Sequence, residues 1–313
     1  AELNRIWLMI DERWNFRIGR EFWLSVSANE CRMSSYHPVR SYLKGLVWDG
    51  VPRIGNWLSA YGGAADNSYT RAVGRLVLVA ACRRVMQPGC KFDEMLIIEG
   101  PTGVDKSGAL AVLGGDWFGN NFPLDGDVQK LMEATAGCWI MEAPELKGMR
   151  RADVNALKGI LSQQHDECRA AYGRKKIKRL RQFVAIGTTN ETGDYLRDQT
   201  GNRRYWPVWC PQFRIAAMSA DRDQIWAEAA AAEATGESIR LVKELWEVAR
   251  DEQENREAVD PVVGAVNRVF GSMVGRVTTD DARKVLGITN RLPTQEEISR
   301  MGAAMRLTGW IYK

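Results

Sequence analysis

The sequence predicts an α/β fold with a central parallel sheet that is flanked by an N-terminal and a C-terminal helical region. Between residues 93 and 212, short apolar runs alternate with helical patterns, which is typical of buried parallel strands separated by helices. On both sides of this stretch the apolar spacing is helical. The expected strands are Met95 to Ile98, Cys138 to Met141, Phe183 to Gly187 and Tyr205 to Trp209.

These patterns divide the 313 residues into three predicted regions, 1–92, 93–212 and 213–313. In the first we expect a helix from Tyr69 to Met86, because the Pro-Gly pair that follows it ends helical periodicity. In the last we expect helices over an Ala-rich stretch from Ile225 to Ala234 and over a run around Ile239 to Arg256. A small compact helical unit, ending near Trp310, should close the chain.

The composition narrows the classes of function. An apolar fraction of 45% with 26% charged residues is ordinary for a soluble protein, and no run reaches the roughly 20 apolar residues of a membrane span. Six scattered cysteines without a CxxC pair, and only two histidines, argue against a zinc site, a disulfide framework and a histidine-based triad. We therefore expect a protein of the reducing cytoplasm with no membrane partner. It starts without Met, which we interpret as a processed start or a cut from a longer chain.

A phosphate-binding loop follows the first expected strand and precedes a helical stretch from Ala109 to Leu113. In the pattern GxxxxGK[ST], successive backbone N–H groups surround the phosphates, Lys reaches the terminal ones, and the hydroxyl residue binds Mg²⁺. The strand, loop and helix occur here in the order that this site needs. The candidate nucleotide-binding residues are Gly100, Pro101, Thr102, Gly103, Val104, Asp105, Lys106 and Ser107.

Asp105 departs from this pattern, since it stands where the second glycine belongs. A Cβ at this position conflicts with the loop conformation that glycine allows, and a carboxylate beside a polyphosphate is repelled. Two like charges about 4 Å apart cost about 4 kcal/mol at an effective dielectric constant of about 20, before screening by salt. We expect weakened nucleotide binding, or a carboxylate that turns away from the phosphates.

Hydrolysis also needs an acidic group for Mg²⁺ and water, and a polar group that orients the water. The second expected strand runs into Glu142 and Glu145, and the third is followed by Asn190. Because ligands of open parallel sheets bind at the carboxyl ends of the strands, we assign Glu142 to Mg²⁺ or water activation, with Glu145 as second candidate. Asn190 is the candidate for orienting the water.

Two basic features complete the candidate site. Arg203 and Arg204 precede the last expected strand, where an arginine can stabilise the transition state at a neighbouring subunit's nucleotide or pair with local carboxylates. The densest positive run of the chain, whose net charge is only +4, extends from Arg169 to Arg181. It predicts a hairpin with a charged tip that follows a phosphate backbone, although such runs are also common on solvated faces. The candidate DNA-binding residues are Arg174, Lys175, Lys176 and Lys178.

With these residues in place, the chain resembles the virulence-associated protein E family of phage and genomic-island proteins, whose core is similar to superfamily 3 helicases of the AAA+ type. The resemblance extends from about Tyr36 to Trp310. The residues that carry it, besides the phosphate loop, are 37–40 (HPVR), 48–54 (WDGVPRI), 87–93 (QPGCKFD), 139–142 (WIME), 187–190 (GTTN), 195–198 (YLRD) and 201–204 (GNRR).

The resemblance implies a P-loop ATPase core that uses ATP and Mg²⁺. Lys106 and Ser107 would bind them, Glu142 would be the acidic group, Asn190 the sensor, and Arg203 or Arg204 the arginine finger. It also implies a hexameric ring with single-stranded DNA in its pore, and a primase, often fused upstream in such proteins, as a partner. Residues 1–92 would then form an oligomerising collar, and residues 213–313 a lid or a winged-helix-like region.

Three functions stay open at this point. The first is an ATP-dependent DNA helicase of phage or prophage replication. The second is a DNA-binding ring or origin-recognition module with a degenerate nucleotide site, which Asp105 favours. The third, a small-molecule phosphotransferase, would be a monomer without DNA affinity.

Overall fold

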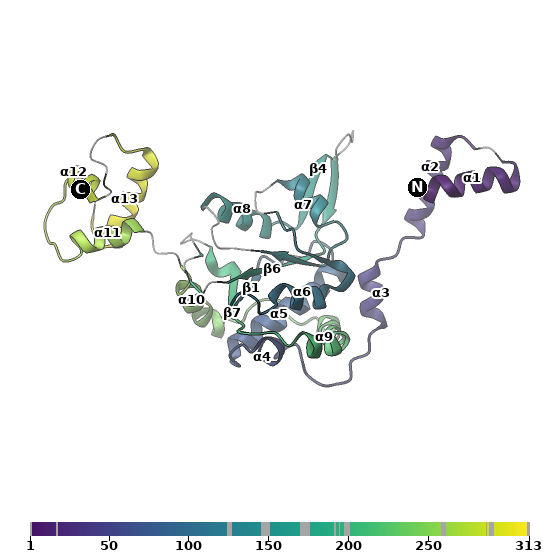
Figure 1. The fold of residues 1–313 in the computed structure, drawn as a ribbon, viewed down its shortest axis with the longest axis horizontal. Coiled ribbons are helices and arrows are strands. Elements are labelled where there is room, and N and C mark those ends of the chain that lie inside the picture. The colour runs from purple at the N-terminus through teal and green to yellow at the C-terminus, as the bar shows by residue number, and fades with distance from the viewer. Residues whose placement is uncertain are drawn as a thin grey trace. The chain divides into compact units, whose positions relative to one another are not determined.

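The computed structural model describes residues 2–16, 18–123, 127–144, 151–169, 176–190, 192–193, 195–196, 201–257, 261–285, 287 and 291–311. The chain forms two compact units, residues 1–45 and residues 46–313. The first contains helices α1 (Glu2–Trp14), α2 (Arg20–Met33) and α3 (Pro38–Gly45), and the second contains the sheet (Figure 1). None of the described helices combines the length and apolar character needed to cross a bilayer.

The second unit is built on a five-stranded sheet in which every pair of neighbouring strands is parallel. The strand order is β2-β3-β6-β1-β7, so that β1 lies between β6 and β7. This confirms the predicted α/β fold with a parallel sheet. The strands are β1 (Met95–Glu99), β2 (Phe118–Gly119), β3 (Ile140–Ala143), β6 (Val184–Thr189) and β7 (Tyr205–Trp209).

The strands β1 and β7 lie where the apolar runs predict them, whereas β3 and β6 differ at their ends. The expected strand from Cys138 is wrong at its start, since β3 begins at Ile140, and β6 extends two residues beyond Gly187 to Thr189. The edge strand β2 was not expected, because a strand of two residues has no sequence pattern.

Helices cover both faces of the sheet (Figure 1). On one face, α5 (Ser68–Met86), α6 (Lys106–Gly114) and α9 (Ile215–Ala234) pack on the strands and on one another. The Trp139 indole donates to the Ala81 carbonyl of α5, and the Trp226 indole of α9 donates to the Leu113 carbonyl of α6. The centroids of the two rings are 4.0 Å apart, so these large aromatic side chains pack the helices against the sheet.

On the other face, α7 (Val128–Ala134) and α8 (Arg151–Leu161) cover an apolar cluster that includes Met95, Ile97 and Met141. Leu131 and Leu157 contribute to this cluster from the two helices. Because alternate residues of a strand point to opposite faces, Met95 and Ile97 share the face on which Glu99 ends β1.

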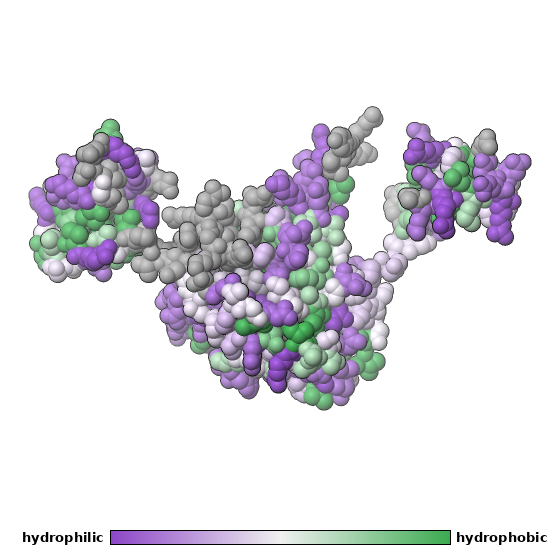
Figure 2. Space-filling model, viewed as in Figure 1, coloured by the Kyte–Doolittle hydropathy of each residue, from purple (hydrophilic) through white to green (hydrophobic). Residues whose placement is uncertain are grey.

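The predicted basic hairpin consists of β4 (His165–Arg169) and β5 (Lys176–Leu180), which pair antiparallel. A buried ion pair anchors its base, since Arg181 donates to Asp166 at 2.8 and 2.5 Å and both side chains are at most 4% exposed. All residues of β5 are exposed. In the space-filling view, mostly hydrophilic residues cover the visible side of the hairpin (Figure 2).

The remaining helices of the second unit are α4 (Trp57–Gly62), α10 (Trp246–Glu254), α11 (Pro261–Phe270), α12 (Thr279–Val285) and α13 (Gln295–Leu307). The helix expected around Ile239 to Arg256 is wrong at its start, because α10 begins at Trp246. The compact C-terminal helical unit is present, with Val266 and Phe270 packed against Met301 and Ala304.

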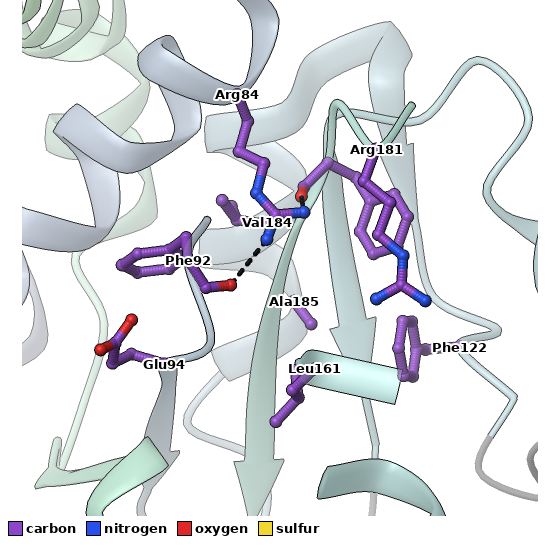
Figure 3. A pocket seen from close by; sticks show the side chains of 9 residues that line it. Arg84, Phe92, Glu94, Phe122, Leu161, Arg181, Val184 and Ala185 are labelled. Carbon is purple, nitrogen blue, oxygen red and sulfur yellow. Dashed lines mark hydrogen bonds between the residues drawn. The ribbon is translucent and has the colours of Figure 1, made fainter. Parts of the chain in front are cut away.

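A small pocket lies near the amino end of β6, lined by Arg84 of α5 together with Phe92, Phe183 and Val184 (Figure 3). The buried Arg84 guanidinium donates to the carbonyls of Phe92 at 2.6 Å and of Phe183 at 3.5 Å. The free volume of the pocket, about 10 Å³, is close to what a single water molecule needs. The pocket is therefore too small for a nucleotide. It lies at the amino ends of the strands, whereas the candidate phosphate loop lies at their carboxyl ends.

Candidate functional site

Residues 100–105, the candidate phosphate loop, connect the end of β1 to the start of α6, as the sequence predicts. The backbone N–H of Gly100 donates to the Thr189 carbonyl at 3.2 Å, which fixes the loop's start against β6. A Cβ at Gly100 would lie 2.3 Å from the carbonyl oxygen of Cys210. Only glycine fits at this position, because the loop passes directly over the backbone that follows β7.

Asp105, at the position of the second glycine in the GxxxxGK[ST] pattern, adopts a backbone conformation that favours glycine. Its φ of 62° and ψ of 42° lie in the left-handed region, which Asp tolerates better than most residues. The carboxylate lies against Gly108, since a Cβ built on Gly108 would be 2.2 Å from Oδ1 of Asp105. The bare Gly108 leaves room for the carboxylate, whereas the positive φ of Asp105 is the backbone conflict that the sequence predicts for a side chain at this position. The carboxylate lies beside the first turn of α6, where a helix N-terminus favours an anion.

The Lys106 side chain is held inside the loop. Its Nζ donates to the carbonyls of Gly100 at 2.8 Å and Pro101 at 2.9 Å and to Oδ1 of Asn190 at 2.8 Å. These three bonds use all three N–H groups of the ammonium. Burial lowers the pKa of Lys106. The structure thus brings Asn190, at the end of β6, into direct contact with the lysine of the phosphate loop.

Ser107 meets Glu142 at the ends of α6 and β3. The Ser107 hydroxyl donates to Oε1 of Glu142 at 2.7 Å, and the Thr188 hydroxyl of β6 donates to the same oxygen at 2.7 Å. Glu142 is only 2% exposed, so these hydroxyls compensate for the lost hydration of its carboxylate. Thr188 was missed from the sequence, although its place two residues before Asn190 at a strand end is a signal of the same kind as that of Asn190.

These oxygen donors fit the Mg²⁺ ion that the resemblance implies. A serine hydroxyl and a carboxylate within hydrogen-bond distance of each other can bind a cation that takes its other ligands from phosphates and water. Among the described residues, no group of three or more His, Cys, Asp or Glu side chains could hold a metal without such help. The second acidic candidate, Glu145, lies outside the described residues.

Arg203 and Arg204 lie in a 3-10 turn (Asn202–Arg204) at the amino end of β7. Arg204 donates to the Ser162 hydroxyl at 3.2 Å, whereas Arg203 is exposed and has no partner among the residues that the structure describes. Neither pairs with a described carboxylate. Because a strand rises about 3.3 Å per residue, β7 places both arginines roughly 15 Å from the phosphate loop of their own chain. Neither could reach a nucleotide bound there.

On the basic hairpin, Lys176 lies 3.4 Å from Glu167 across the strand pair, and both side chains are exposed. Lys178 is exposed and has no partner within the described ranges. The tip residues Arg174 and Lys175 fall outside those ranges. The described part of the hairpin thus presents one unpaired lysine and one that is loosely paired.

Comparison with known proteins places the chain in a family. The model of the virulence-associated protein E-like domain matches residues 43–258, which include the whole sheet and the candidate site. No curated protein matches the chain.

Among solved structures, the chain is similar to the NrS-1 C-terminal region in its apo state, with a TM-score of 0.49, 13% identity and 84% of this chain covered. A second apo structure of that region, in its A form, gives a TM-score of 0.47 at 13% identity. The chain spans 65% of the length of either structure. Since the family model covers more than half of the chain, this protein belongs to the virulence-associated protein E-like family.

Proposed function

We propose that this chain is the ATP-hydrolysing motor of a DNA helicase or translocase that acts in phage or prophage DNA replication in the bacterial cytoplasm. The single observation that carries this proposal is a pair of contacts at the carboxyl ends of the parallel strands. Lys106 binds Asn190 at 2.8 Å, and Ser107 binds Glu142 at 2.7 Å. A phosphate loop, an acidic group and a water-orienting amide on three parallel strands are the parts that nucleotide hydrolysis requires.

In this proposal, different residues bind the phosphates, hold Mg²⁺ and activate the attacking water. The loop from Gly100 to Asp105 and the Lys106 ammonium bind the phosphates of ATP, and Lys106 exchanges its internal acceptors for phosphate oxygens. Ser107 and Glu142 would hold Mg²⁺, which would neutralise charge on the phosphates. Alternatively, Glu142, freed from its hydroxyl partners, accepts a proton from water that Asn190 orients.

The proposed assembly is a homo-oligomeric ring, which we take to be hexameric, around single-stranded DNA. Residues 1–92 would form its collar, residues 213–313 a lid or winged-helix-like region, and a primase would work alongside it. The exposed strand β5 would face the pore. Support for the DNA contact comes from the exposed basic residues of this strand and from the insertion of the hairpin between β3 and β6 in the sequence, two strands that both end at the candidate site.

The first test is ATP hydrolysis by the full chain with and without single-stranded DNA. We expect DNA to stimulate hydrolysis and Lys178→Glu to abolish the stimulation while leaving the basal rate within about twofold. The variant should also reduce the slope of log binding constant against log salt by about 0.7 per lost phosphate contact. Lys243→Glu, at an exposed lysine outside the hairpin, is the matched control. Equal DNA stimulation in both variants would remove the hairpin from the DNA site.

Of the two arginine candidates, Arg203 is the better one for acting on a neighbouring subunit, because it is exposed and unpaired among the described residues whereas Arg204 holds Ser162. We expect Arg203→Ala to lower hydrolysis by a factor on the order of 10³. Mixing it with Lys106→Ala subunits, which have an intact Arg203 but no working loop, should restore part of the activity. Full hydrolysis by Arg203→Ala alone would exclude this role.

A second candidate function is a DNA-binding ring with a degenerate nucleotide site. The position of the Asp105 carboxylate beside the first turn of α6 favours it. Salt-sensitive DNA binding that ATP does not change, in both this chain and Asp105→Gly, would support this second function over the first.

A further inference from the structure

The residue before the phosphate loop is a fully buried carboxylate. Glu99 ends β1 and is 0% exposed, on the strand face whose other residues, Met95 and Ile97, belong to an apolar cluster. An apolar side chain would continue that face without the cost of removing a charge from water. The presence of Glu99 here therefore requires a reason beyond packing.

Glu99 has two partners that come from distant parts of the sequence. Arg256 donates to both carboxylate oxygens, from Nε to Oε1 at 2.8 Å and from a terminal nitrogen to Oε2 at 2.7 Å. The Tyr195 hydroxyl donates to Oε1 at 2.7 Å. Burial, the charge of Glu99 and the hydrogen bond raise the pKa of Tyr195 well above its usual value, so the hydroxyl stays protonated and donates.

Arg256 is itself held in place. Burial alone would lower the pKa of its guanidinium, but the hydrogen bonds and the charge of Glu99 outweigh burial and raise it. The other terminal nitrogen of Arg256 donates to the backbone carbonyl and to the carboxylate of Glu252, four residues earlier. A bidentate arginine–carboxylate pair fixes both distance and orientation, which an apolar contact does not.

The backbone around Arg256 joins the segment that follows Asn190. Leu196 donates its N–H to the Arg256 carbonyl at 3.1 Å, and Leu196 pairs with Glu257 as an isolated parallel bridge. The Asn202 amide donates to the Glu257 carboxylate at 2.8 Å. The segment directly after α10 is thus bonded to Leu196, which follows β6, and to Glu99, the last residue of β1.

We propose that Glu99 and Arg256 are positioning residues, which fix the phosphate loop relative to the strand end that carries Asn190. Glu99 directly precedes Gly100, and Tyr195 follows Asn190 by five residues, so one carboxylate binds both segments that meet at the Lys106 ammonium. This inference rests on the proposed function. A misplacement of about 1 Å between such segments can slow catalysis about 100-fold, even where binding is retained.

The test separates positioning from stability. Arg256→Met leaves Glu99 buried without its partner and should lower the melting temperature. The double variant Glu99→Leu with Arg256→Met replaces the pair by apolar groups of similar size, which often restores the stability lost with one charged partner, while the buried Tyr195 hydroxyl loses its acceptor. We expect the double variant to melt at a higher temperature than Arg256→Met and still show kcat lowered about 10- to 100-fold relative to the unmodified chain, with KM for ATP changed by less than about threefold. Arg256→Lys should have a kcat between those of the unmodified chain and the double variant, because it keeps the charge and loses the bidentate geometry.

Arg250→Met is the matched control, since Arg250 is an exposed arginine of α10, which ends two residues before Arg256, and its partner Glu254 is also exposed. It should change neither kcat nor stability. A double variant that melts normally and keeps its full kcat would overturn the proposal.

A second readout needs no hydrolysis. Without nucleotide, hydrogen exchange at the amides of residues 100, 102–105, 195 and 196 should be faster in the double variant than in the unmodified chain and in Arg250→Met. Unchanged exchange at these amides would also overturn the positioning role. If the unmodified chain and Asp105→Gly both fail to bind ATP, the proposed function fails, and the exchange result still decides the structural claim.

Discussion

Replacing Asp105 by glycine is expected to tighten the binding of Mg²⁺-ATP by a factor on the order of 10² to 10³. The carboxylate lies against Gly108 beside the first turn of α6, on the loop proposed to bind the phosphates. Two like charges about 4 Å apart cost about 4 kcal/mol at an effective dielectric constant of about 20, and screening by salt reduces this. Because glycine also adopts positive φ without strain, the loop should keep its shape. Equilibrium titration with a fluorescent ATP analogue measures the change.

Asp105→Asn separates the charge from the Cβ. Asn tolerates the left-handed conformation as well as Asp does, so any gain in affinity comes from removing the charge. We expect Asn to recover most of the gain seen with glycine, and hydrolysis with single-stranded DNA to rise in parallel. If affinity stays within about twofold in both variants, the carboxylate lies outside the field of the phosphates and the loop is not weakened by it.

Replacing Glu142 by glutamine is expected to lower kcat for ATP by a factor on the order of 10² to 10⁴, the range that a general base contributes. Glutamine keeps an oxygen that can accept from the hydroxyls of Ser107 and Thr188, so the fold around this site should persist. It loses the charge needed to take a proton from water and to hold Mg²⁺. Steady-state hydrolysis, together with ATP binding at saturating Mg²⁺, distinguishes a chemical defect from a binding defect.

Glu133→Gln, at an exposed glutamate of α7, is the matched control and should leave hydrolysis unchanged. If Glu142→Gln hydrolyses ATP at the original rate, the acidic role passes to another residue. Glu145, which follows the same strand, is then the first residue to test.

Much of the fold and part of the site could be predicted from the sequence, because both depend on local patterns. The apolar runs at Met95 and Tyr205 are long enough to identify β1 and β7, and the parallel arrangement brings Glu142 and Asn190 to one sheet edge. The contacts of Lys106 with Asn190 and of Ser107 with Glu142 follow from that arrangement. The division at residues 92 and 212 stays a prediction.

What the sequence could not provide are contacts between distant residues. Glu99 and Arg256 are 157 positions apart, and nothing near either residue indicates that the two side chains meet. Thr188 lies inside a strand that seemed to end at Gly187, so its hydroxyl was not placed beside Glu142. The effect of Asp105 on the loop depends on what residue 108 leaves open, which becomes visible only when the first turn of α6 is built.

The contact between Asp105 and Gly108 also restricts the order in which this loop can change during evolution. A side chain at position 108 would collide with the carboxylate, since even a Cβ there would be 2.2 Å from Oδ1. A side chain at position 108 therefore requires the Asp105 carboxylate to move, and this requirement disappears after a glycine has replaced Asp105. In a saturation library, the two sites should show strong epistasis of one sign, with alanine at 108 enriched only among variants that lack the aspartate.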